Sequence, residues 1–113
     1  MKYLSIALFG MGLFLTHAAE AKEYNCSGVA RNMTTNEATS GVMKARITDL
    51  GSSITVNFGP LSYTTSKISP EKTEGKIFPS GVTKEGNIIQ RRGEGDYRFF
   101  QMSLGDVVQL TCE

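Results

Sequence analysis

The sequence predicts an all-β protein: a small antiparallel meander of about eight strands that closes into a barrel and is stapled by one disulfide. The chain of 113 residues has 12 glycines, and most of them separate short runs in which apolar and polar residues alternate. Such alternation is typical of strands with one buried face. No segment keeps a helical period over three turns. Two cysteines lie at opposite ends of these runs.

Alternation of side chains predicts each of the first four strands. Met43, Ala45 and Ile47 alternate with polar or charged residues, and so do Ile54 and Val56. Polar or glycine-containing connectors separate these runs, as expected of turns. The four strands are predicted over 23–30, 42–50, 53–58 and 61–68.

The remaining strands are also short and lie between turn sequences. Residues 69–75 are rich in turn formers and are expected to form a loop, and a strand just before Pro79 is expected to end there. A tight hairpin connection is predicted over 104–106. The last four strands are predicted over 76–78, 87–92, 96–104 and 106–112.

The run 96–104 has two candidate faces. Tyr97 and Phe99 alternate with a larger apolar set of Phe100, Met102 and Leu104. The larger set is expected in the core, which leaves Tyr97 and Phe99 partly exposed and suited to a partner-binding surface. The alternative is that both rings pack under a loop.

The first residues predict a secretory signal peptide over 1–21. A lysine near the start, an apolar run over 3–17 and the pattern Ala19-Glu20-Ala21 are typical of such a peptide and its cleavage site. The apolar run is too short and wrongly flanked for a membrane anchor. We therefore expect a periplasmic or secreted product that forms a single domain over residues 22–113.

Cys26 and Cys112 predict one disulfide, because an even cysteine count in an exported chain indicates a bridge. For a loop this long, the chain-entropy model assigns the bridge about 4–5 kcal/mol. The bridge requires the two Cα atoms to lie within about 7 Å. In a meander this brings the first and last strands together, which favours a closed barrel over an open sandwich.

Composition argues against several functions. Without the signal peptide the chain has 11 basic and 10 acidic residues, and a net charge of +1 gives no basic footprint for nucleic acid. The only histidine, His17, leaves with the signal peptide. We therefore expect no histidine-based catalysis, no metal site and no cofactor.

Arg91 and Arg92 are candidate contact residues, because paired guanidinium groups bind carboxylates or phosphates. The alternative is a solvated strand edge beside Glu94 and Asp96. These two carboxylates lie in a glycine-containing turn, and a general acid needs a buried environment, so we expect no catalytic residue here.

Several motifs place this chain near a known family. The matching residues are Tyr24, Cys26, Ser80-Gly81, Arg92-Gly93 and Cys112 in the closing "VVQLTC". In layout the chain resembles the membrane-bound and periplasmic inhibitors of c-type lysozyme. The resemblance implies an eight-stranded β-barrel with a closing disulfide, in which Ser80 and Arg92 enter the lysozyme cleft and meet its catalytic carboxylates.

The chain departs from the family pattern at three positions. Lys84 stands where the family has a tyrosine, Gln90 stands where it has an aromatic residue, and Arg92 stands where it usually has lysine. The expectation is an exported, non-enzymatic binding protein that inhibits a lysozyme-like hydrolase. The alternatives are a barrel that binds a small ligand and a structural envelope protein with an unknown partner.

Overall fold

The computed structural model describes residues 21–73 and 75–113, which fold into one antiparallel sheet of nine strands. The predicted signal peptide, except for Ala21, lies outside the described residues. The strands are β1 (Lys22–Asn32), β2 (Ala38–Asp49), β3 (Ile54–Phe58), β4 (Leu61–Thr64), β5 (Ser69–Thr73), β6 (Lys76–Val82), β7 (Ile88–Gly93), β8 (Asp96–Gln101) and β9 (Asp106–Cys112).

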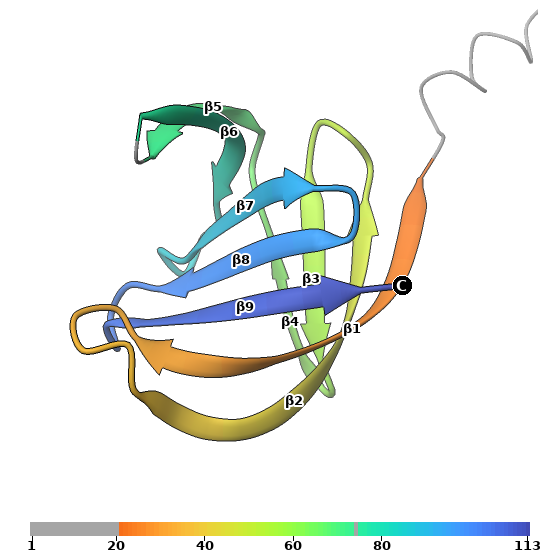
Figure 1. Cartoon of the computed structure of the whole chain (residues 1–113). Coiled ribbons are helices and arrows are strands. Elements are labelled where there is room, and N and C mark those ends of the chain that lie inside the picture. Colours follow the sequence, from red (N-terminus) through yellow and green to blue (C-terminus); the bar gives the residue numbers. More distant parts are fainter. Residues whose placement is uncertain (1–20, 74) are drawn as a thin grey trace, which may run out of the picture.

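The first and last strands meet in the middle of the sheet. The strand order is β4-β3-β2-β1-β9-β8-β7-β6-β5 (Figure 1). Cys26 lies in register with Cys112, and their Cα atoms are 4.0 Å apart in a disulfide. The predictions of an all-β antiparallel fold and of this bridge are confirmed.

The prediction of a closed barrel is wrong, because the sheet curls into a half-barrel that stays open. The disulfide requires only that β1 and β9 adjoin. A closed barrel would also need strand pairing between the two ends of the sheet, which lie farthest from the disulfide. There β5 pairs with the outer edge of β6, so that edge is not available to β4. One isolated bridge, between Thr65 and Thr83, joins the two sides.

The structure has nine strands where the sequence predicts about eight. The additional strand is β5, which lies within the segment 69–75 that is expected to be a loop. It exists because β6 is longer than predicted and offers an edge. Proline has no N–H for a sheet ladder, yet β6 continues through Pro79, since β7 pairs with β6 only from Ser80 onward.

The core lies on the inner face of the curled sheet. Every second residue of the central strands points into it, as the alternation predicts. Its fully buried side chains are Ile47, Ile54, Val56, Ile89, Tyr97, Phe99, Val108 and Leu110.

The prediction that Tyr97 and Phe99 are partly exposed is wrong, because both rings are buried in the core. Met102 and Leu104 are instead exposed, at 50% and 65%. The strand ends at Gln101, and the N–H of Leu104 donates to the Gln101 carbonyl in the turn that follows. Met102 and Leu104 therefore belong to a turn, where the alternation of a strand no longer decides which side chains face the core.

Candidate functional site: two arginines on opposite faces of β7

Strand β7 places its two arginines on opposite faces of the sheet. Arg91 lies in register with Tyr97 of β8, whose ring is in the core. Arg92 is the next residue, so its side chain points to the outer face. The same face carries Gln90, which lies in register with Ser80 of β6.

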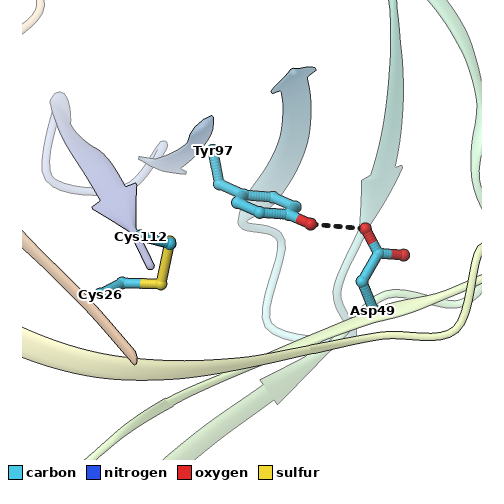
Figure 2. The surroundings of a disulfide bond; sticks show 4 residues. All are labelled: Cys26, Asp49, Tyr97 and Cys112. Atoms are coloured by element: carbon cyan, nitrogen blue, oxygen red, sulfur yellow. Dashed lines mark hydrogen bonds between the residues drawn. A yellow bond between two sulfur atoms is a disulfide. The ribbon is translucent and has the colours of Figure 1, made fainter. Parts of the chain in front are cut away.

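On the inner face Arg91 binds Asp49 through both ends of its guanidinium. Its Nε donates to Oδ2 of Asp49 and one terminal nitrogen donates to Oδ1, each at 2.7 Å. The hydroxyl of Tyr97 donates to the same Oδ2 at 2.6 Å (Figure 2). The N–H of Gly51 donates to Oδ1 at 2.8 Å. Asp49 thus accepts two hydrogen bonds at each oxygen.

Burial and hydrogen bonding together set the charges of this cluster. Burial alone would raise the pKa of Asp49, but the hydrogen bonds from Arg91, Tyr97 and Gly51 outweigh it and hold that pKa below its ordinary value. The hydrogen bond to Asp49 raises the pKa of Arg91. Burial and the adjacent carboxylate raise the pKa of Tyr97. At neutral pH the cluster is therefore a carboxylate, a guanidinium and a neutral phenol.

This inner cluster ties the end of β2 to the β7–β8 hairpin. Tyr97 also packs against Tyr24 of β1, with ring centroids 5.9 Å apart. A general base in this cluster would have to be Asp49. Its carboxylate already accepts four hydrogen bonds within the protein. The arrangement stabilises the fold and offers no general base.

On the outer face a chain of hydrogen bonds runs from Ser80 to Arg92. The hydroxyl of Ser80 donates to the carbonyl of Phe78 at 3.3 Å, and the amide of Gln90 donates to the Ser80 hydroxyl at 3.2 Å. The Nε of Arg92 donates to the side-chain oxygen of Gln90. The guanidinium carbon of Arg92 lies 4.4 Å from the centre of the Phe78 ring.

The five predicted contact residues do not form one surface. Ser80 and Arg92 are brought together, but Ser80 is buried and only Arg92 of the two is partly exposed. Arg91 lies on the other face in its ion pair with Asp49. Tyr97 and Phe99 belong to the core.

Two residues of this outer site were missed by the sequence reasoning. Gln90 is buried and links Ser80 to Arg92, although the sequence reasoning treated it only as a departure from a family pattern. Phe78 supplies the ring under Arg92. Phe78 lies two residues before Ser80, and Gln90 lies two residues before Arg92. Residues two apart in a strand share a face, and this spacing was the available signal.

Comparisons with protein-family models, with curated proteins and with solved structures found no match for this chain. Within residues 21–73 and 75–113, no helix is long and apolar enough to cross a membrane. The same part of the chain has no group of three or more His, Cys, Asp or Glu side chains placed to hold a metal ion.

Proposed function

We propose that this protein is an exported, non-catalytic binding module that places Arg92 against a carboxylate in the cleft of a lysozyme-like hydrolase. The disulfide supports a non-reducing compartment. The single observation that carries the proposal is the fixed position of Arg92, which rests on Phe78 and donates to Gln90. The resemblance to the lysozyme inhibitors supplies the class of partner.

A fixed guanidinium favours binding for two reasons. Its hydrogen bonds to a carboxylate are charge-assisted and stronger than those between neutral groups. A side chain that is already ordered loses less conformational entropy when the partner binds. Phe78 and Gln90 order Arg92 before any partner is present.

Ser80 has a different role in this proposal from the one that the resemblance implies. It is buried and bonded to Gln90, so it acts as a positioning residue behind Arg92. Removal of its hydroxyl would loosen Gln90 and, through Gln90, the guanidinium. We expect Ser80→Ala to cost about 1 kcal/mol of binding, the magnitude of one neutral hydrogen bond.

The alternative of a small-ligand carrier is not favoured by the packing of the core. The rings of Phe58, Tyr63 and Phe99 contact one another, with centroids 5.0 Å to 6.3 Å apart. These contacts fill the inner face of the sheet at β3, β4 and β8. A stoichiometric complex of the folded protein with a fatty acid would contradict this choice.

The test is inhibition of a c-type lysozyme by the oxidised, exported protein. Arg92→Ala should weaken inhibition by about 2–4 kcal/mol, the cost of truncating one partner of a buried charge pair. Arg31→Ala is the matched control, since Arg31 is exposed on a distant hairpin and makes one bond to a backbone carbonyl. A parent protein that does not inhibit at micromolar concentration would end the proposal. Equal losses for the two variants would place the contact elsewhere.

A further inference from the structure

The opening in the half-barrel leaves a hollow beside the free edge of β4. Its volume is about 500 Å³. One wall is formed by Ser62, Thr64 and Ser66, and the other by the segment 82–85 at the tip of the β6–β7 hairpin. The walls meet at Thr65 and Thr83 and separate toward Ser62.

The backbone of β4 points its hydrogen-bonding groups alternately at β3 and at this hollow. The N–H of Thr65 donates to the Ile54 carbonyl at 3.0 Å, on the β3 side. One residue on, the N–H of Ser66 donates to the Val82 carbonyl at 3.1 Å, across the opening. Since this direction alternates along an antiparallel strand, the N–H and C=O groups of Ser62 and Thr64 face the hollow.

The joint at the closed end of the hollow depends on a glycine. A Cβ on Gly81 would lie 2.7 Å from the Lys67 carbonyl oxygen and 2.7 Å from the Cβ of Thr65. The chain that leaves β4 therefore crosses directly over the β6 backbone at Gly81. This crossing holds the two walls together at the bridge between Thr65 and Thr83.

A hollow with a wall on each side favours a single extended segment over a second folded copy. Neighbouring strands in a sheet lie about 4.8 Å apart, so one added strand can pair with β4. A second copy would have to offer its own β4, which is flanked by its own segment 82–85. The two hairpins would meet before the two edges could pair.

The side chains around the hollow indicate a polar segment that carries both charges. Ser62 is exposed and presents its hydroxyl group, and Lys84 and Glu85 are adjacent and exposed. We propose that the free edge of β4 binds an extended polypeptide segment of this kind as an added antiparallel strand. This site is separate from the outer-face site of Arg92 and does not depend on it.

The test uses the oxidised, exported protein and a phage-displayed library of random heptapeptides as the probe. Ser62→Pro removes the N–H that faces the hollow. Proline is tolerated there because that N–H does not bond to β3 and edge strands accept its φ angle. Ser62→Ala is the matched control, because it shortens the side chain and keeps the N–H.

Peptides selected on the parent should bind Ser62→Ala within about twofold of the parent and lose at least about tenfold on Ser62→Pro, as expected when main-chain bonds give the affinity. Methylation of the peptide backbone nitrogens should weaken binding at every second position and leave the intervening positions within about twofold. This scan uses only the parent protein, so it carries the test even if Ser62→Pro does not fold.

Three results would overturn the proposal. The first is that no heptapeptide prefers the parent to a folded Ser62→Pro. The second is a methylation scan without alternation. The third is a dimer of the parent that Ser62→Pro abolishes, which would make a second copy the occupant of the edge.

Discussion

The inner and outer faces of the β7–β8 hairpin use the same residue type in opposite ways. Arg91 and Arg92 are consecutive, yet Arg91 is held by a buried carboxylate and Arg92 by an amide and an aromatic ring. The side chain of Asp49 is 7% exposed and that of Arg91 is 24% exposed. The inner arginine has its counter-charge on Asp49, and the outer one is the residue proposed to meet a carboxylate of a partner. One step along a strand therefore separates a stabilising residue from a candidate binding residue.

The largest expected effect is the loss of the disulfide on the inner face. The disulfide lies beside Tyr97 (Figure 2) and closes a loop with a sequence separation of 86. Replacing both Cys26 and Cys112 by serine should lower the free energy of unfolding by about 4–5 kcal/mol, the chain-entropy value for such a loop. Urea denaturation followed by circular dichroism measures this loss. An unchanged unfolding midpoint would show that strand pairing alone holds β1 to β9.

The second-largest effect is the difference in the free energy of unfolding between variants of Arg91 and Arg92. Arg91→Ala leaves Asp49 buried without its counter-ion and should lower the free energy of unfolding by about 3 kcal/mol. Arg92→Ala should change it by less than about 1 kcal/mol, as is typical of partly exposed charges. Urea denaturation of both variants gives the comparison. Equal losses would mean that the outer site is as important for folding as the inner one.

The third effect concerns the hydrogen bond from Tyr97. Tyr97→Phe keeps the ring in the core and removes only the donor to Asp49. We expect a loss of about 1.5–2 kcal/mol, since the acceptor is a carboxylate. The matched control is Tyr24→Phe, because Tyr24 packs against Tyr97 but is only half-buried. If the control loses as much stability as Tyr97→Phe, the bond to Asp49 is not the cause.

The smallest effect is the pH dependence of the inner face. The pKa of Asp49 is lowered by folding, so its contribution is present above about pH 3.9, the ordinary value for aspartate, and is lost as the pH falls through the folded value. The pKa of Tyr97 is raised, so its contribution is present below about pH 10 and is lost as the pH rises further.

Thermal unfolding across this range measures both limits. Tyr97→Phe should lose stability less steeply than the parent above pH 10, and Asp49→Asn should do so below pH 4. Arg92→Ala should follow the parent curve at both ends, because Arg92 lies on the opposite face of the sheet, with Gln90 and Phe78. A parent curve that is flat at both ends would mean that neither group contributes through its ionisation.

Predictions from the sequence succeeded where one strand was enough to decide the outcome. Alternation placed Ala45, Ile47, Ile54 and Val56 on the buried face without reference to any neighbour. It failed at Tyr97 because the end of β8 depends on where the turn to β9 forms. The candidate site was predicted in part, since Ser80 and Arg92 lie in one hydrogen-bonded chain, but Gln90 between them was not identified.

The sequence by itself determined the all-β class, the antiparallel order and the pairing of Cys26 with Cys112. Side-chain period and cysteine count are properties of the chain, and two cysteines allow one connectivity. Only the tertiary structure decided that β5 takes the edge of β6 and leaves the barrel open, and that Asp49 meets Arg91 rather than Arg92. Asp49 lies 42 positions from Arg91 in the sequence. Such contacts depend on which strands become neighbours, and neither alternation nor composition carries that information.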